Sequence, residues 1–225
     1  MADKKKAKIL RRFFKTGKGQ YGEGDIFLGV VMPKQRALVK KYWQDISLVD
    51  LNKLIKSKIH EERLVALLIL VRQYEHADAS LRSKIFRFYL KHAKYINNWD
   101  LVDLSAPNIV GAYLFEYCSG DVVVLNKLAK SSNLWERRIA IIATFYFIRK
   151  GSPDHTLILA KMLLADKHDL IHKAVGWMLR EAGKRCGEKI LSDFLDVNYR
   201  KMPRTMLRYA IERLPERKRR HYLDK

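Results

Sequence analysis

Residues 137–150, "RRIAIIATFYFIRK", decide the fold class of this chain. Apolar side chains recur there at spacings of three and four, which is the period of an α-helix. The same rhythm runs through residues 64–74, "LVALLILVRQY", and residues 171–184, "IHKAVGWMLREAGK". Alternating strand patterns are rare and short, so the sequence predicts an all-α protein.

Three of these helices carry a basic residue at the same place before an apolar run. Arg63, Arg138 and Lys173 fit a repeat of about 37 residues, with one further unit between the first two. Two helices per unit, without the tetratricopeptide signature, are typical of HEAT-like hairpins. We therefore expect one domain over residues 1–225, a right-handed superhelical solenoid with a concave basic groove. Residues 1–32 should form an N-terminal helix and a glycine-rich segment that packs on the first repeat.

Local signals mark where helices begin and end. Ser47 and Asp78 each stand where a side-chain oxygen can cap the first turn of a helix. Gly151 and Gly187 mark gaps between helices. The one long irregular segment, residues 15–33, is rich in glycine but lacks the spacing of a nucleotide-binding fingerprint. We therefore expect no nucleotide cofactor.

The charge balance predicts a polyanionic partner. Lysine plus arginine number 45 and aspartate plus glutamate 24, for a net charge of +21. Nucleic acid is the first such partner and an acidic membrane surface the second. The alternative is that the charge only keeps the protein in solution, on solvated helix faces. The candidate contacts to DNA phosphates are Lys15, Lys18, Arg63, Arg137, Arg138, Lys173 and Arg180.

Several classes of protein are disfavoured by what the sequence lacks. The apolar run at residues 64–71 is too short to span a membrane, and no signal peptide opens the chain. Cys118 and Cys186 lie far apart, which argues against a disulfide framework and a structural zinc site. The histidines form no HExxH or HxH pair, which argues against a metal hydrolase. We expect an intracellular protein without a metal ion or cofactor.

A possible reactive constellation appears in the stretch "NNWDLVDLSAP". Trp99 and Asp103 stand four residues apart, on one face of a helix, while Arg138 and Trp177 occupy the corresponding places in later repeats. A single carboxylate suits a bond that is already weak, such as the glycosidic bond of a cationic alkylated purine. The base leaves neutral, and the carboxylate stabilises the oxocarbenium-like sugar and orients water. Indole faces attract cations, and Arg138 would grip a phosphate and keep Asp103 ionised.

A purely structural reading of the same residues stays open. Asp103 could pair with Arg138 or cap a helix that begins at "DLSAP". Trp99 and Trp177 could pack in the core, where tryptophan is most often found. Asp100 is a neighbouring carboxylate with the same alternatives.

Blocks of the sequence resemble the HEAT-like-repeat DNA glycosylases of the bacterial DNA alkylation repair family (AlkD type). These are "NNWDLVD", "LWERRIAI" and "HKAVGWMLRE", in this order and spacing, with "YGEGDIFLGVVMPKQR" near the N-terminus. The resemblance implies an alkylpurine DNA glycosylase, a monofunctional hydrolase acting on bases of the 3-methyladenine and 7-methylguanine type in duplex DNA. It implies no deep pocket for a flipped base, unlike most glycosylases. It assigns Asp103 as the catalytic carboxylate, Trp99 and Trp177 to the backbone around the lesion, and Arg138 to a phosphate.

Relatives of that family keep the fold without the activity, so an alternative function stays open. It is a non-catalytic HEAT-repeat DNA-binding protein for branched or damaged DNA. A third possibility is a solenoid whose basic surface binds an acidic protein. On the resemblance we expect a monomer in base excision repair that binds duplex DNA in the bacterial cytoplasm, at the nucleoid.

Overall fold

Helices make up nearly all of the regular structure in the part of the chain that the computed structural model describes, residues 2–118 and 123–224. Over these two ranges, β-structure is limited to one isolated bridge between Ile26 and Ile59. The prediction of an all-α protein is therefore confirmed. None of the helices in these ranges is long and apolar enough to cross a membrane.

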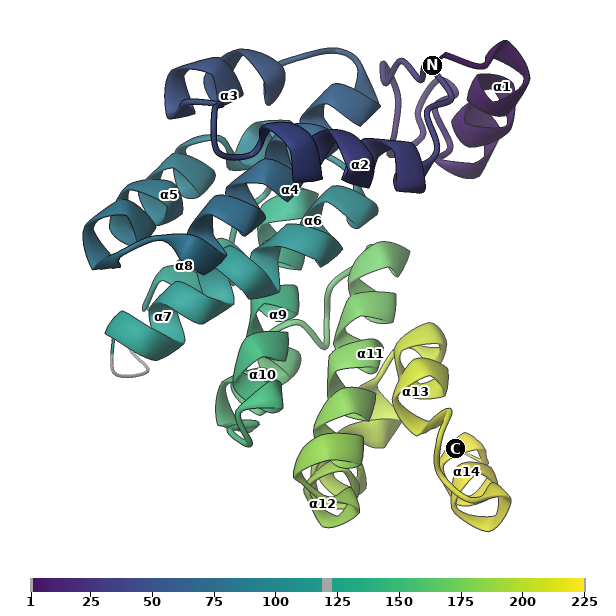
Figure 1. Cartoon of the computed structure of the whole chain (residues 1–225). Helices are drawn as coiled ribbons and strands as arrows, with labels where there is room; N and C mark the ends of the chain where they lie inside the picture. The colour runs from purple at the N-terminus through teal and green to yellow at the C-terminus, as the bar shows by residue number, and fades with distance from the viewer. Residues whose placement is uncertain (1, 119–122, 225) are drawn as a thin grey trace. The chain divides into compact units, whose positions relative to one another are not determined.

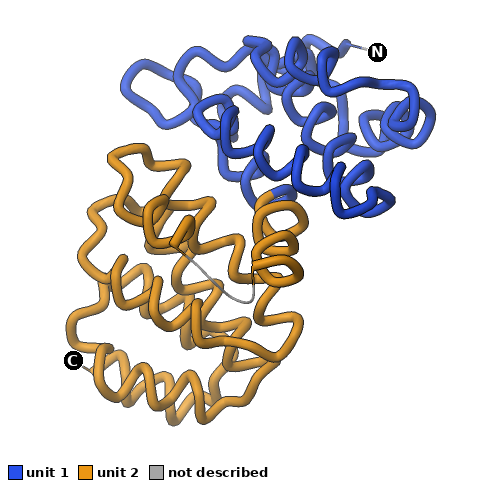
Figure 2. The backbone as a smooth tube through the Cα atoms, turned by 90° about the vertical axis from the view of Figure 1, so that its left-hand side faces the viewer, with its two compact units in different colours: residues 1–105 blue, residues 106–225 orange. Residues whose placement is uncertain are grey.

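The chain divides into two compact units, Met1–Ser105 and Ala106–Lys225 (Figure 2). The superhelical path, the concave basic groove and the single domain expected from the repeats stay predictions.

Unit 1 is built around α4, the helix that contains the apolar run from Leu64. Leu64, Leu67, Ile69 and Leu70 are at most 3% exposed. Because apolar residues occur on nearly every side of α4, neighbouring helices cover it almost completely. The helices of unit 1 are α1 (Lys4–Phe13), α2 (Met32–Tyr42), α3 (Leu48–Leu54), α4 (His60–His76), α5 (Ala79–Lys91), the short 3₁₀ helix η1 (Ala93–Tyr95) and α6 (Trp99–Ala106), which runs one residue past the unit boundary (Figure 1).

Two predicted helix starts of unit 1 are confirmed by their caps. The Ser47 hydroxyl accepts a hydrogen bond from the backbone amide of Asp50, 3.2 Å away. The Asp78 carboxylate accepts one from the amide of Leu81, 2.8 Å away. Both side chains satisfy amides that have no partner within the helix.

The glycine-rich segment between α1 and α2 is fastened to both α1 and α4. The Glu61 carboxylate, in the first turn of α4, accepts hydrogen bonds from three consecutive backbone amides, those of residues 28–30, at 2.8–3.2 Å. Gly29 has a φ of 82°, and a Cβ there would lie 2.2 Å from the carbonyl oxygen of Asp3. Only glycine fits at this point, because the chain must cross the start of α1 in a left-handed conformation.

Unit 2 packs its long helices α9 and α11 against shorter neighbours. In α9, Ile139, Ile141 and Ile142 are fully buried. Gly176 lets α11 approach α13, since a Cβ there would lie 2.5 Å from the carbonyl oxygen of Met206; the two helices lie side by side in Figure 1. The helices of unit 2 are the π-helix η2 (Pro107–Gly111), α7 (Ala112–Tyr117), α8 (Val123–Ala129), α9 (Leu134–Arg149), α10 (Asp154–Met162), α11 (Asp169–Cys186), α12 (Glu188–Asn198), the 3₁₀ helix η3 (Tyr199–Lys201), α13 (Arg204–Ile211) and α14 (Glu216–Leu223).

The helical chain does not end at Asp103. α6 continues without a break into the π-helix that begins at Pro107, because Ala106 keeps a helical backbone conformation. Pro107 has no N–H to donate to the carbonyl of Asp103, and a wider helical turn at this point accommodates the missing bond. The alternative in which Asp103 caps a new helix is therefore wrong, since Asp103 lies inside a helix.

Candidate functional site

Trp99, the first residue of α6, is held by the N-terminal part of unit 1. Its ring stacks on Phe14, with centroids 5.3 Å apart, and meets the edge of Phe13 at 5.9 Å. Its indole N–H donates to the hydroxyl of Tyr21, 3.3 Å away. The side chain is half-buried, so Trp99 is not sealed in the core.

Asp103 lies one helical turn further along α6 and is half-buried. Asp103 interacts electrostatically with Tyr89. The hydroxyl of Tyr89 lies 2.9 Å from the Ser105 hydroxyl. Burial raises the pKa of the Tyr89 phenol, and the nearby charge of Asp103 raises that pKa further. Asp103 therefore lies near a buried phenol whose raised pKa keeps it neutral.

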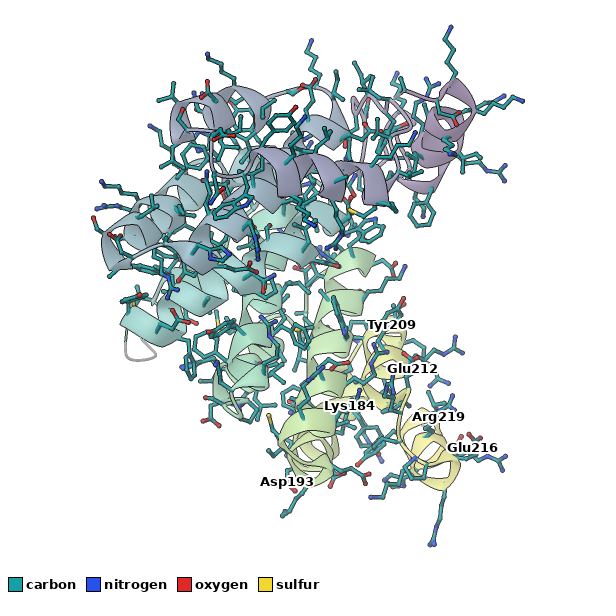
Figure 3. The ribbon with its side chains drawn as sticks, in the orientation of Figure 1. Lys184, Asp193, Tyr209, Glu212, Glu216 and Arg219 are labelled. Carbon is teal, nitrogen blue, oxygen red and sulfur yellow. The ribbon has the colours of Figure 1, made fainter. Side chains whose placement is uncertain are left out.

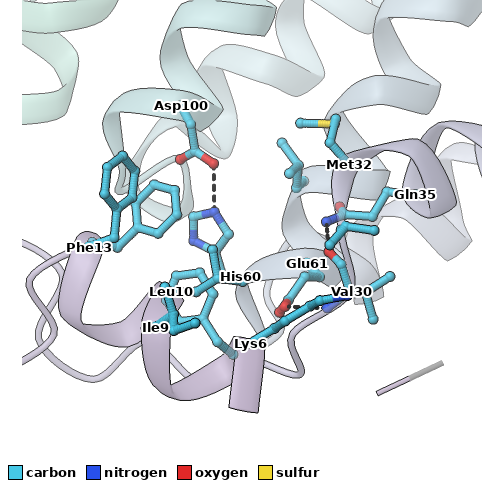
Figure 4. Close-up of a pocket in the computed structure, with 14 residues that line it drawn as sticks. Lys6, Ile9, Leu10, Phe13, Val30, Met32, Gln35, His60, Glu61 and Asp100 are labelled. Atoms are coloured by element: carbon cyan, nitrogen blue, oxygen red, sulfur yellow. Dashed lines mark hydrogen bonds and ion pairs between the residues drawn. The ribbon is translucent and has the colours of Figure 1, made fainter. Parts of the chain in front are cut away.

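A buried network of charged side chains supports the first turn of α6. The imidazole Nδ1 of His60 lies 3.1 Å from the Asp25 carboxylate, and its Nε2 lies 2.8 Å from the Asp100 carboxylate (Figure 4 shows the second contact). The guanidinium of Arg63 donates to the other oxygen of Asp25 at 2.7 Å. The network thus links the glycine-rich segment, α4 and α6.

The pKa directions in this network agree with its geometry. Burial by itself would lower the pKa of His60, but hydrogen bonds to Asp100 and Asp25 raise it above its usual value. Burial by itself would raise the pKa of Asp25, but the hydrogen bond from His60 and the charge of Arg63 bring it below its usual value. Both shifts favour the charged forms.

An apolar pocket of about 310 Å³ lies beside this network in unit 1 (Figure 4). Its wall includes Phe13, Phe14 and Phe27, with His60 and Asp100 among its polar residues. The predicted site residues of α6 that would act on a substrate do not line it. The pocket is therefore a neighbour of the candidate site and distinct from it.

In unit 2, the two predicted site residues are held in different ways. Arg138, on α9, is 5% exposed, and its guanidinium donates to the carbonyl oxygen of Leu170 at 2.5 Å. Trp177, on α11, is half-buried, with its ring 5.9 Å from that of Phe145. A role for Arg138 in gripping a phosphate stays a prediction, and it requires the guanidinium to reach beyond this internal bond.

The other predicted DNA contacts fall into two groups. Lys15 and Lys18 are exposed on the glycine-rich segment of unit 1. Lys173 is partly exposed and lies 2.7 Å from the Asp169 carboxylate on the same helix. These three cations have the exposure that a phosphate contact requires.

The remaining predicted contacts are engaged inside their own units. Arg63 is 3% exposed, within the Asp25 network. The guanidinium of Arg137 pairs with Asp166 at 2.6 Å. Arg180 pairs with Glu212, which Figure 3 labels at the end of α13. For these residues DNA binding stays a prediction, and each would first have to give up an ion pair.

Sequence reasoning missed a cationic cluster beside Trp177. The guanidinium groups of Arg149 and Arg185 both face the ring of Phe145, at 5.2 and 5.3 Å from its centroid. Burial lowers the pKa of Arg149, and the nearby charge of Arg185 lowers it further. The four-residue spacing of Phe145 and Arg149 could have indicated their contact on α9. Nothing in the sequence indicated that Arg185, on α11, joins them. The Asp25 network was missed for the same reason.

Two of three comparisons with known proteins found a match, one of the sequence to a family profile and one of the fold to a solved structure. The sequence matches the family profile described as "DNA alkylation repair enzyme" over residues 1–214. A search of curated proteins found no match. The fold is similar to a solved structure titled "Predicted DNA alkylation repair enzyme from Enterococcus faecalis", with a TM-score of 0.75 and 16% sequence identity, covering 96% of this chain and 98% of that chain.

Proposed function

Because the chain belongs to the DNA alkylation repair enzyme family, we propose that it is a DNA glycosylase acting on cationic alkylated purines. Its substrates are bases of the 3-methyladenine and 7-methylguanine type in duplex DNA. The observation that carries this proposal is the placement of Trp99 and Asp103 on successive turns of α6, both half-buried. An indole and a carboxylate that are both partly open to solvent can act together on a cationic group.

The proposed reaction breaks the bond between C1′ of the sugar and the purine nitrogen. Both electrons of that bond go to the base, which carries a positive charge and so leaves neutral without a general acid. The Asp103 carboxylate stabilises the positive charge that develops on the sugar. Water then adds to C1′, and its proton passes to Asp103 or to solvent. The products are a free base and an abasic site with the DNA strand intact.

The aromatic and basic residues supply binding in this proposal. The Trp99 face is attracted to the cationic lesion and to the cationic sugar, by roughly 0.5–2 kcal/mol. Trp177 and Arg138 meet the DNA backbone, while Lys15 and Lys18 add contacts that do not depend on sequence. The net charge of +21 supports such binding.

The test is base release from alkylated duplex DNA by the native protein and by Asp103→Asn. We expect the substitution to slow release by about 10²–10³-fold, as loss of one preorganised electrostatic group does, while DNA binding persists. Glu62→Gln is the matched control, because Glu62 is also a half-buried helical carboxylate of unit 1. Native release by Asp103→Asn would show that Asp103 is not the catalytic carboxylate.

A second function is favoured by the charge alone. With a net charge of +21, the protein can bind DNA strongly without any chemistry. A non-catalytic protein for branched or damaged DNA would bind in a strongly salt-dependent way and release no base. The same assay separates the two functions, since only the glycosylase produces free base from the native protein.

A further inference from the structure

We propose that the buried side chains Asp25, His60 and Asp100 act as a positioning device, through which the glycine-rich segment sets the placement of Trp99 and Asp103 on α6. The inference rests on the proposed function, for which α6 carries the reacting carboxylate. None of the three residues has to touch DNA. They act through the first turn of the helix.

Two separate paths connect Asp25 to α6. The first runs through His60 to the carboxylate of Asp100, with contacts of 3.1 and 2.8 Å. The second runs through Asn98, whose amide group donates to Asp25 at 3.4 Å and whose oxygen accepts from the backbone amide of Trp99 at 2.9 Å. Asp25 thus reaches the first two residues of α6, and Asp103 follows one turn later.

Burial makes these contacts specific. The side chains of His60 and Asp25 are 2% and 4% exposed, and that of Asp100 is 14% exposed. Asn98 is fully buried. A buried polar group that loses its partner keeps the cost of its lost hydration, so the network strongly disfavours other positions of the segment.

The glycine-rich segment also holds the indole directly. Phe14, just after α1, stacks on Trp99, and Tyr21 accepts the indole hydrogen bond at 3.3 Å. Phe27 stacks on His60, with centroids 4.5 Å apart. One stretch of chain therefore contacts Trp99 from its face and from its polar edge while fixing the helix that carries it.

The two carboxylate contacts of His60, together with its raised pKa, favour the positively charged imidazole. An ionised carboxylate only accepts hydrogen bonds, so an imidazole that bridges two carboxylates must donate from both nitrogens and be positively charged. When that proton is lost, one nitrogen lone pair faces a carboxylate and one link opens. The charged groups around His60 are Asp25 from the segment, Asp100 from α6, Arg63 and Glu61 from α4, and Lys6 of α1 in the wall of the adjoining pocket.

The test compares two histidine-to-glutamine variants. In His60→Gln an amide nitrogen and an amide oxygen replace the two ring nitrogens, so one of the two carboxylates faces an oxygen that cannot donate. We expect it to slow single-turnover base release about 10- to 100-fold, the range for small misplacements of reacting groups, with DNA affinity within about threefold of native. Release by the native protein should also fall as pH rises through the pKa of His60, and the variant should lack this dependence.

The matched control is His92→Gln. His92 is a second buried histidine of unit 1, with both ring nitrogens hydrogen-bonded, to Asn52 and to the carbonyl of Phe88, each at 2.8 Å. Over residues 2–118 and 123–224, its hydrogen bonds and ring contacts do not involve the first turn of α6. We expect its release rate to stay within about threefold of native. Equal loss in the two variants, or native release by His60→Gln, would overturn the inference.

A readout without activity separates this inference from the proposed function. In an NMR spectrum the indole N–H of Trp99, assigned by Trp99→Phe, should shift in His60→Gln and in Asp25→Asn but not in His92→Gln. If the native protein releases no base, the proposed function fails, and this resonance alone decides the inference. An indole signal that is unchanged in both network variants would overturn it, whatever the activity.

Discussion

The two units hold the tryptophans of the candidate site, Trp99 and Trp177, by different kinds of interaction. In unit 1, Trp99 begins a helix whose first turn is fixed by buried charges and long-range hydrogen bonds. In unit 2, Trp177 follows Gly176, where α11 presses its backbone against α13. The arrangement around Trp99 depends on the protonation of His60, and the arrangement around Trp177 depends on the small volume of the residue at position 176. Two side chains of the same type can therefore respond to quite different perturbations.

The largest effect that sharpens this contrast should come from Gly176→Ala. A Cβ there would lie 2.5 Å from both the carbonyl oxygen of Met206 and the Cβ of Tyr209, so α13 must move. We expect a loss of about 3 kcal/mol in the free energy of unfolding, at the upper end for overpacking, measured by urea denaturation. Gly17→Ala is the control, because its new Cβ would meet only the flexible end of Gln20. A Gly176→Ala protein as stable as native would contradict the close packing.

The next effect concerns the polar support of unit 1. Glu61→Ala removes the single carboxylate oxygen, Oε1, that accepts from all three backbone amides of residues 28–30. Leaving buried donors unsatisfied should cost about 2 kcal/mol of unfolding free energy. The same substitution at half-buried Glu62 should cost less than about 0.5 kcal/mol. Similar losses at the two positions would mean that the contacts to the backbone amides do not contribute to the free energy of unfolding.

The buried His60 network should give unit 1 a contribution to the free energy of unfolding that depends on pH. The pKa of His60 is raised in the folded state, so its stabilisation is fully present below the unfolded value near 6.5 and is lost as pH rises through the folded pKa. Asp25 has a lowered pKa, so its contribution is lost only as pH falls below the usual carboxyl range. The difference in unfolding free energy between native and His60→Gln should therefore shrink as pH rises above ~6.5, with a slope of at most about 1.4 kcal/mol per pH unit. A difference independent of pH would contradict a charged His60.

The smallest effect should come from an exposed cation of the glycine-rich segment. If Lys15 contacts a phosphate, Lys15→Ala should weaken duplex binding less than about tenfold and reduce the slope of log K against log salt by about 0.9. Fluorescence anisotropy over a salt series measures both. Lys189→Ala is the control, since Lys189 is also exposed to solvent but pairs with Asp193 at 2.8 Å. An unchanged slope would remove Lys15 from the contact surface.

Periodicity predicted much of the architecture because helices leave a local signal. The apolar runs at residues 64–74, 137–150 and 171–184 all lie in long helices, α4, α9 and α11. The caps at Ser47 and Asp78 were also readable, since each acts on an amide three residues away. The continuation of α6 past Asp103 could not be predicted from the sequence, because proline usually ends a helix and only the surrounding packing favours a π-helical turn.

The candidate site was only partly predictable. Spacing placed Trp99 and Asp103 on one helix face, and both are half-buried there. The spacing gave no indication that Arg63, expected to contact a DNA phosphate, is 3% exposed and bound to Asp25. A basic residue at a fixed place in each repeat has the same sequence signal whether its partner is a phosphate or a buried carboxylate.

By itself the sequence determined that the protein is helical, strongly basic and similar to one family, because composition and local periodicity carry that information. Only the tertiary structure decided what holds Trp99 and the first turn of α6 in place. The deciding contacts join residues 35, 40 and 78 positions apart in the chain. Contacts over such separations follow no periodic pattern and become visible only when the packed helices bring their side chains together.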